Sequence, residues 1–129
     1  MDGRNVITSL HHVGRLTDDL DEGIKFYESM GFKVASEFTF DSAGAKAAMM
    51  KKDKAIVELW QFKDETNELA EMVKNHFALA TDNIEEDIQK FVDAGYTVAI
   101  PIDKGKVVKR YAYVKDKAGN YIELCEPLD

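Results

Sequence analysis

Two histidines and two glutamates recur at matching places along this chain, and together they could bind one divalent metal ion. His12 and His76 are 64 residues apart, and Glu58 and Glu123 are 65 residues apart. Two neutral imidazoles and two carboxylates would balance a divalent cation, whereas unpaired buried charge is costly. Their mixed nitrogen and oxygen donors suit Ni²⁺, Zn²⁺, Mn²⁺, Co²⁺ or Fe²⁺ better than Ca²⁺. We therefore expect this quartet to hold one ion, with Ni²⁺ or Zn²⁺ as the first choices.

The quartet belongs to an internal repeat. The segment HHVGRLTDDLDEGIKFYESMGFKV, which begins at His11, aligns without a gap with NHFALATDNIEEDIQKFVDAGYTV, which begins at Asn75. After one insertion the repeat continues, so that the glutamate of VEL at Glu58 matches the glutamate of IEL at Glu123. A lone histidine or glutamate in a strand is usually a packing or surface residue. A set that recurs in both copies is not easily explained by coincidence.

Each copy is predicted to fold as a strand, a helix and three further strands. Capping residues at Thr17-Asp18-Asp19, and at Asp82 or Asn83, precede amphipathic stretches that stop at Gly31 and Gly95. Short apolar runs separated by turn residues supply the strands. We expect strands at 7–16, 33–40, 45–51 and 55–62 in the first copy, and at 97–102, 107–115 and 121–126 in the second copy after an opening strand around His76.

Length and repeat together predict a single domain of the α+β class. The chain has 129 residues, which is enough to bury a core of its own. We place this domain at 1–129, with module one at 5–62, a connector at 63–73 that contains a helical turn or two, and module two at 74–127. Because each βαβββ sheet leaves edges and an open face to cover, we also expect a homodimer.

Strand alternation indicates which residues face the candidate site. Side chains point to opposite faces along a strand, so the apolar neighbours of each ligand point towards the helices. His11 has the opposite parity to His12, and we interpret it as structural. The residues predicted to line a substrate pocket are Trp60, Tyr111, Tyr113 and Tyr121. Cys125 shares the ligand face, and we predict an inert buried thiol because no histidine is placed to activate it.

Composition argues against several kinds of partner. The net charge is −7 without a basic cluster, which argues against nucleic acid. No run of about 18 apolar residues could span a membrane, and no signal sequence is present, so we expect a cytoplasmic protein that does not bind membranes. The single cysteine cannot form an intrachain disulfide, which is compatible with a reducing compartment. A small molecule is the expected partner.

These motifs make the chain similar to the vicinal oxygen chelate superfamily, which includes glyoxalase I, methylmalonyl-CoA epimerase, extradiol dioxygenases, fosfomycin-resistance enzymes and bleomycin-binding proteins. The motifs that carry the resemblance cover nearly the whole chain: LHHVG, KFYESMGF, VEL, NHFALATDNI and KDKAGNYIELCEP. The resemblance implies that the two tandem βαβββ modules form a curved mixed sheet, a cup with the helices on its outer face.

Within this superfamily the ligand set is most similar to that of compact bacterial glyoxalase I (lactoylglutathione lyase). Epimerases usually carry Gln where this chain has Glu58, dioxygenases and fosfomycin-modifying enzymes use two histidines and one carboxylate, and drug-binding members tend to lose the ligands. One position departs from the glyoxalase pattern. Where compact glyoxalase I proteins have an arginine that holds glutathione, this chain has Leu16, so the identity of the thiol stays open.

The resemblance implies a metal-dependent lyase or isomerase that moves a proton within a substrate whose two vicinal oxygens chelate the ion. Glu58 and Glu123 are the catalytic candidates, because either could leave the ion and act as general base. The expected substrate is a methylglyoxal–thiol hemithioacetal or a related molecule. Two alternatives stay open: an epimerase or ring-cleaving dioxygenase, and a non-catalytic protein that binds an antibiotic or a small aromatic compound.

Overall fold

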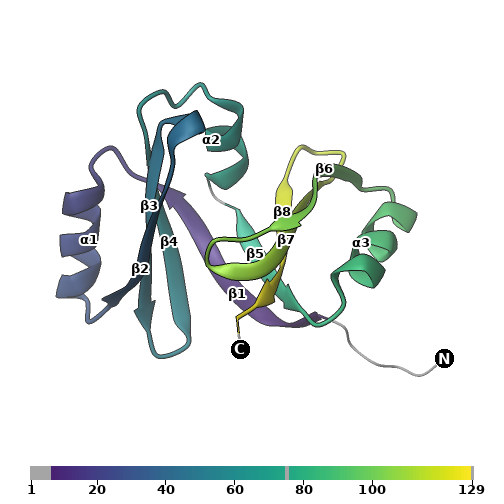
Figure 1. Ribbon diagram of the computed structural model, residues 1–129, viewed down its shortest axis with the longest axis horizontal. Coiled ribbons are helices and arrows are strands. Elements are labelled where there is room, and N and C mark those ends of the chain that lie inside the picture. The colour runs from purple at the N-terminus through teal and green to yellow at the C-terminus, as the bar shows by residue number, and fades with distance from the viewer. Residues whose placement is uncertain (1–6, 75, 129) are drawn as a thin grey trace. The chain divides into compact units, whose positions relative to one another are not determined.

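The computed structural model describes residues 7–74 and 76–128, and the chain divides into two compact units. The N-terminal unit is His12–His76, and the C-terminal unit joins the described residues before His12 to those from Phe77 onward. Strand β1 (Ile7–Leu16) contributes its first half to the C-terminal unit and its second half to the N-terminal unit (Figure 1). Residues 5 and 6 of the expected module one, and Asn75, lie outside the described residues. The single domain over 1–129 stays a prediction.

In the N-terminal unit β1 is followed by a helix and three strands. These are α1 (Leu20–Ser29), β2 (Lys33–Phe40), β3 (Ala45–Lys52) and β4 (Ala55–Phe62), with a short 3-10 helix, η1 (Asp41–Ala43), between β2 and β3. The strand order is β2-β3-β4-β1, in which β1 and β4 are parallel and the other pairs antiparallel. Helix α2 (Glu68–Val73) lies where the sequence predicts a connector with a helical turn or two.

The C-terminal unit repeats this arrangement. Its elements are β5 (Phe77–Thr81), α3 (Ile84–Asp93), β6 (Thr97–Lys104), β7 (Val108–Lys115) and β8 (Tyr121–Pro127), in the strand order β1-β5-β8-β7-β6. The parallel strand pair of each unit, β1 with β4 and β5 with β8, has the same register. Gly14 of β1 lies opposite Glu58, and its counterpart Ala78 of β5 lies opposite Glu123. The predicted α+β class and the two βαβββ modules are confirmed.

The helix ends follow the predicted local signals. Asp19 and Asn83 are the N-caps of α1 and α3, and each side chain accepts a hydrogen bond from a backbone N–H in the first turn of its helix. Gly31 and Gly95 follow the two helices with φ of +96° and +102°, a region that favours glycine. Within the described ranges, no helix is long and apolar enough to cross a membrane.

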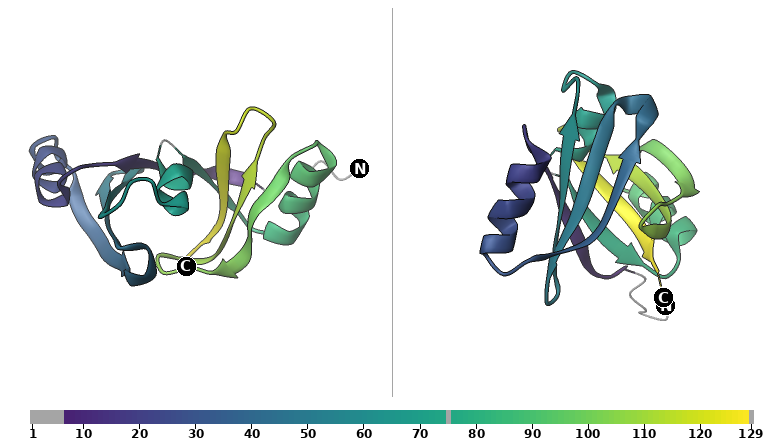
Figure 2. Two further views of the ribbon diagram at one scale, coloured as in Figure 1. Left: turned by 90° about the horizontal axis from the view of Figure 1, so that it is seen from above. Right: turned by 60° about the vertical axis from the view of Figure 1, so that its left-hand side comes forward.

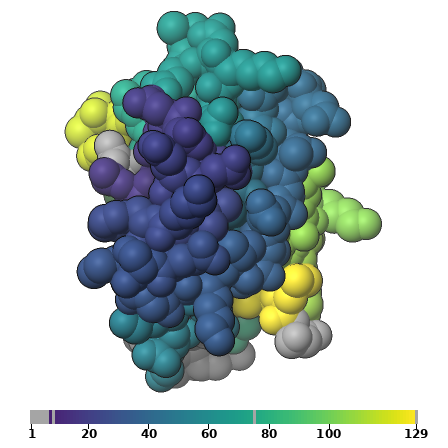
Figure 3. All heavy atoms as spheres, turned by 90° about the vertical axis from the view of Figure 1, so that its left-hand side faces the viewer, coloured from purple at the N-terminus to yellow at the C-terminus, as the bar shows by residue number. Residues whose placement is uncertain are grey.

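The sheet of the N-terminal unit is covered on both faces, because adjacent residues of β4 pack against different helices. Leu59 packs with α1, which lies over one side of this unit in dark blue in Figure 3. The buried residues of that face are Leu20, Ala48, Met50 and Leu59. Trp60 points the other way and packs against α2, which Figure 2 shows on the opposite side of the strands from α1. The buried apolar cluster there consists of Ala45, Ala47, Trp60, Phe62, Ala70 and Val73.

The face chosen by α2 differs from the expectation that every helix lies outside the ligand face. The amphipathic helix α1 packs on the outer face, as predicted. In α2 the buried residues, Ala70 and Val73, are three positions apart and therefore share one side of the helix. That side meets Trp60 and Phe62, so the connector helix closes the ligand face of its own unit.

In the C-terminal unit α3 covers one face of the sheet. Ile84 of α3 is buried against Ala112 of β7 and Leu124 of β8. A second buried cluster forms on the other face. It consists of Ala78, Val108 and Cys125. The thiol of Cys125 is buried, as the sequence predicts.

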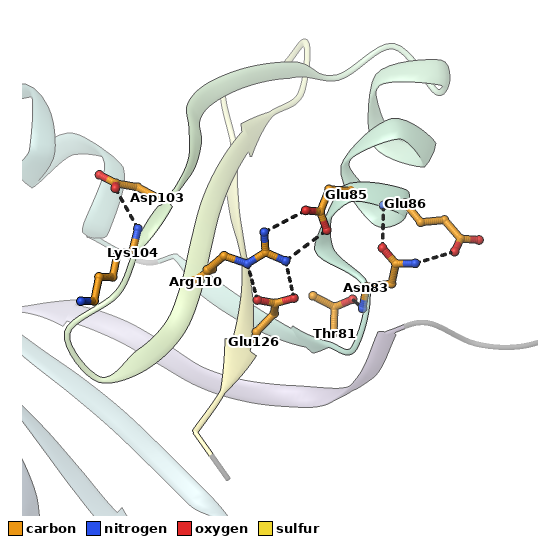
Figure 4. A network of polar contacts seen from close by, with 8 residues as sticks. All are labelled: Thr81, Asn83, Glu85, Glu86, Asp103, Lys104, Arg110 and Glu126. Carbon is orange, nitrogen blue, oxygen red and sulfur yellow. Dashed lines mark hydrogen bonds and ion pairs between the residues drawn. The ribbon is translucent and has the colours of Figure 1, made fainter.

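Arg110 of β7 ties α3 to the sheet of the C-terminal unit (Figure 4). Its guanidinium donates to both carboxylate oxygens of Glu126 in β8, at 2.6 and 2.8 Å, and to both oxygens of Glu85 in α3, at 2.8 and 3.1 Å. The hydrogen bonds from Arg110 lower the pKa of both carboxyl groups, and the two carboxylates in turn raise the pKa of Arg110. Two-point pairing of this kind also restricts the orientation of the groups.

The lowered pKa of Glu126 predicts a stability term that depends on pH. A carboxyl whose pKa is lower in the folded protein stabilises it above the unfolded-state pKa, ordinarily 4.5, and loses this effect as pH falls through the folded-state value. Urea unfolding should show Glu126→Gln to be less stable than the wild type at pH 7, by about 1 kcal/mol or less as for accessible ion pairs. This difference should shrink as the pH falls below 4.5.

The control is Glu37→Gln, which removes an exposed carboxylate of β2. It should change the unfolding free energy little at either pH. A Glu126→Gln deficit that persisted unchanged at pH 3 would contradict the assignment to the ionised carboxylate.

Candidate metal centre

Three of the four predicted ligands meet inside the N-terminal unit. Nε2 of His12 lies 3.3 Å from Nε2 of His76 and 3.5 Å from Oε1 of Glu58, and Nε2 of His76 lies 3.7 Å from the same oxygen. His12 and His76 are each 2% exposed, and Glu58 is 4% exposed. They come from β1, from the residue before β5, and from β4. This buried group of histidine nitrogens and carboxylate oxygen could hold a metal ion.

The spacing of the three atoms fits a metal ion. A point equidistant from them in their common plane lies about 2 Å from each, which is the usual bond length from Zn²⁺ to an imidazole nitrogen or a carboxylate oxygen. The donor types agree as well, because imidazole and carboxylate together suit first-row divalent ions. A single cation would also offset the negative charge of buried Glu58.

The parallel pairing of β1 and β4 explains how His12 and Glu58 come together. Gly14 lies directly opposite Glu58, and His12, two residues earlier on β1, shares its side of the strand. Leu59 points to the face of α1, so Glu58 must point to the opposite face. His11 is half-buried, whereas His12 is buried.

His76 is positioned by the end of α2 rather than by a strand. The sequence places it within a strand, but β5 begins at Phe77. Nδ1 of His76 donates to the carbonyl oxygen of Val73 at 2.6 Å, because a carbonyl can only accept. The proton is therefore on Nδ1, and Nε2 keeps the lone pair that a metal ion needs. The backbone N–H of Gly14 donates to the carbonyl of His76 at 2.7 Å and anchors the residue from the other side.

Gly14 provides the space for the ring of His76. A Cβ at this position would lie 2.1 Å from Cε1 and 2.2 Å from Nδ1 of His76. Sequence reasoning missed this function, although Gly14 is part of the LHHVG motif. Its counterpart in the second module is Ala78, so the requirement for glycine belongs to the first module alone.

Trp60, predicted to line a substrate pocket, is a buried hydrogen-bond donor to the centre. Its Nε1–H donates to Oε1 of Glu58 at 2.6 Å. The ring lies in an aromatic cluster with Phe38, Phe40 and Phe62. Leu16, which stands where glyoxalase I proteins have an arginine, packs against the same apolar group.

The fourth predicted ligand, Glu123, is buried in the C-terminal unit. It faces Tyr113 on the neighbouring strand, and the hydroxyl of Tyr113 donates to Oε1 of Glu123 at 3.1 Å. Tyr111 is half-buried and packs edge-on against Tyr113, with ring centroids 6.2 Å apart. Burial, followed by the negative charges of Asp103 and Glu123, raises the pKa of Tyr111.

The remaining predicted pocket residue, Tyr121, lies at the start of β8. It is half-buried, and Nζ of Lys115 lies 5.2 Å from the centre of its ring. This contact is a cation–π interaction with a neighbouring strand.

The fold and the site together indicate a known class of protein. Residues 9–124 match the Glyoxalase/Bleomycin resistance protein/Dioxygenase superfamily. The match covers most of the chain, and the protein belongs to this superfamily, as its motifs led us to expect. Among curated proteins, none matches the chain closely enough to count as a relative.

Several solved structures share the fold. Methylmalonyl-CoA epimerase from Mycobacterium tuberculosis aligns with a TM-score of 0.82 and 23% identity, over 100% of this chain and 94% of that chain. A variant of the Streptomyces coelicolor epimerase, solved with 2-nitronate-propionyl-CoA, aligns with a TM-score of 0.80 and 22% identity, over 94% and 95% of the two chains. A hypothetical protein from Bacillus halodurans C-125 aligns with a TM-score of 0.78 and 22% identity, over 93% and 94%. At these identities the likeness shows the fold.

Gly14→Ala should impair metal binding, because the added Cβ meets the ring of His76 and lies 2.7 Å from the carbonyl oxygen of Val73. We expect the affinity for Ni²⁺ and Zn²⁺ to fall by about 10-fold or more, in line with other disturbances of the groups that orient a ligand. Metal retained after gel filtration, measured by mass spectrometry, provides the test. Wild-type affinity in this variant would contradict a ligand role for His76 in its present position.

The matched control is Gly23→Ala in α1. Its Cβ would meet the flexible end of Leu59 at 3.3 Å and would lie 3.5 and 3.7 Å from Oγ1 and Cγ2 of Thr17, which is ordinary contact. This variant should bind metal like the wild type and gain about 0.5–1 kcal/mol in unfolding free energy, because alanine favours the helix over glycine.

Proposed function

We propose that this protein is a metal-dependent isomerase that removes a carbon-bound proton from its substrate and returns it to the same or the neighbouring carbon. The observation that carries the proposal is the buried meeting of three donor atoms from His12, Glu58 and His76. We propose Glu123 as the fourth ligand, because the repeat pairs it with Glu58 as it pairs His76 with His12. Ni²⁺ and Zn²⁺ are the proposed ions.

The residues of the centre have two roles: the histidines bind the ion, and a carboxylate transfers the proton. His12 and His76 bind through neutral Nε2, and the Nδ1 hydrogen bond to Val73 keeps His76 in the required tautomer. When bound, the ion supplies a Lewis acid that stabilises negative charge on two vicinal oxygens of the substrate. A carboxylate of Glu58 or Glu123 accepts the proton from carbon and then returns it. The apolar cluster around Trp60 excludes water from this side of Glu58.

The proposed substrate is the hemithioacetal of methylglyoxal with a small thiol. Transfer of the proton from C1 to C2 converts it into an S-2-hydroxyacyl thioester, and no oxidant or further reactant is consumed. The carboxylate ligand Glu58 supports this choice, because the resemblance associates it with glyoxalase I. Leu16, packed among apolar side chains, supports a thiol other than glutathione.

A second candidate is epimerisation of an acyl-CoA thioester. It is favoured by the similarity of the fold to methylmalonyl-CoA epimerases, one of which was solved in complex with methylmalonyl-CoA. In this reaction the proton returns to the same carbon, with inverted configuration. The two candidates thus share the base and the ion and differ in the carbon that receives the proton. The homodimer stays a prediction.

The test begins with protein that has been stripped by a chelator and reloaded with Ni²⁺, Zn²⁺, Co²⁺ or Mn²⁺. Proton NMR in D₂O then follows methylglyoxal with several thiols, and separately methylmalonyl-CoA. Product formation from a hemithioacetal supports the first candidate, and deuterium at C2 of the acyl group supports the second. Failure to bind a stoichiometric amount of any ion would sink the proposal and favour a non-catalytic binding protein.

Glu58→Gln and Glu123→Gln should each abolish most of the activity found. Loss of a general base lowers the rate by about 100- to 10,000-fold, and loss of a carboxylate ligand adds a loss of metal. Glu126→Gln, three residues from Glu123 on the same strand, is the matched control and should keep wild-type turnover. Measurements of kcat and of bound metal for all three variants separate the two effects.

A further inference from the structure

Trp60 is the only tryptophan of the chain, and it contacts the candidate metal centre directly. Its indole N–H donates to Oε1 of Glu58 at 2.6 Å. The same oxygen faces His12 at 3.5 Å and His76 at 3.7 Å. A carboxylate oxygen has two lone pairs. One of them accepts the indole hydrogen, which leaves the other for a metal ion.

Aromatic packing fixes the direction of the indole N–H. The rings of Phe40 and Phe62 stack on Trp60 with centroids at 5.7 and 5.6 Å, and Phe38 meets it edge-on at 5.3 Å. Trp60 is 4% exposed, so water does not compete for its hydrogen bond. The indole cannot turn away from Glu58 without disrupting this cluster.

We propose that Trp60 is a positioning residue, whose N–H holds the carboxylate of Glu58 in the orientation that binds the metal ion. The inference rests on the proposed function, because it takes Glu58 to be a ligand. The terminal torsion of glutamate has a broad energy profile, so without the N–H the carboxylate would rotate and Oε1 would leave its position. Groups that orient a ligand contribute about 10- to 100-fold to metal affinity.

The C-terminal unit offers a comparison within the same chain. Glu123 is held by the hydroxyl of Tyr113 at 3.1 Å, a longer hydrogen bond than the one from Trp60. A hydroxyl hydrogen rotates to suit its acceptor, whereas the indole hydrogen has one direction. The indole N–H therefore restricts the orientation of Glu58 more closely than the hydroxyl of Tyr113 restricts that of Glu123.

The single tryptophan allows a test at one atom. In a tryptophan-auxotrophic strain, 3-benzothienylalanine replaces only Trp60, with a sulfur in place of the N–H and nearly the same ring shape. 5-Fluorotryptophan, which keeps the N–H, is the matched control. Competition with a chromophoric chelator then gives the dissociation constants for Ni²⁺ and Zn²⁺. The benzothienyl protein should bind both ions about 10- to 100-fold more weakly, and the fluorotryptophan protein should bind them like the unsubstituted protein.

A spectroscopic readout separates positioning from packing. In the Co²⁺-loaded proteins, the visible absorption bands report the coordination of the ion. These bands should change in the benzothienyl protein and be restored by 5-fluorotryptophan, while the thermal unfolding temperatures of the metal-free proteins stay close together. A role in packing alone would leave both affinity and bands unchanged.

One outcome would overturn the role of Trp60, and another would overturn the proposed reaction. Equal affinities and equal Co²⁺ spectra with and without the N–H overturn the positioning role of Trp60, and they leave the proposed reaction to be judged by turnover. Tight metal binding by the unsubstituted protein, together with no proton transfer on any substrate offered, overturns the proposed reaction and leaves the role of Trp60 intact.

Discussion

The parallel pairing of β1 with β4 is the constraint on which the candidate centre depends. It sets Gly14 beside Glu58 and places His12 on the same face, and it leaves Leu59 for the core beneath α1. A slip of one residue would exchange the faces of a whole strand. Glu58 would then lie against the apolar side of α1, and Leu59 would lie beside the histidine. The apolar core and the polar centre therefore enforce the same register.

Much of this arrangement follows from signals that are local in the chain. The strand bounds in the first module, the capping residues Asp19 and Asn83, and the glycines after each helix are set by neighbouring residues, so they could be predicted. The choice of His12 over His11 needed only strand alternation. The repeat then linked residues that are far apart, because two copies of one module place equivalent side chains at equivalent points.

The features that escaped prediction have no counterpart in the second copy. Gly14 corresponds to Ala78, and Trp60 corresponds to Cys125, so the space for His76 and the donor to Glu58 could not be inferred by analogy between modules. Gly14 meets the ring of a residue that is distant in sequence. Trp60 and Glu58 are two residues apart on β4, but the packing of Phe38 and Phe40 on the indole is long-range. The face taken by α2 belongs to this group too, since the connector lies outside the repeat. Superfamily membership defines the fold around these features, whereas the chemistry depends on the individual side chains.

The carbonyl of Val73, at the end of α2, fixes the position of His76. It accepts hydrogen bonds from both the ring and the backbone N–H of His76, at 2.6 and 3.4 Å. These contacts hold His76 at a fixed distance from the end of α2. If the chain arose by duplication of one module, the contact between Val73 and His76 formed when the two copies were joined. A cut of the chain between Val73 and His76 would separate the ring from the carbonyl that orients it.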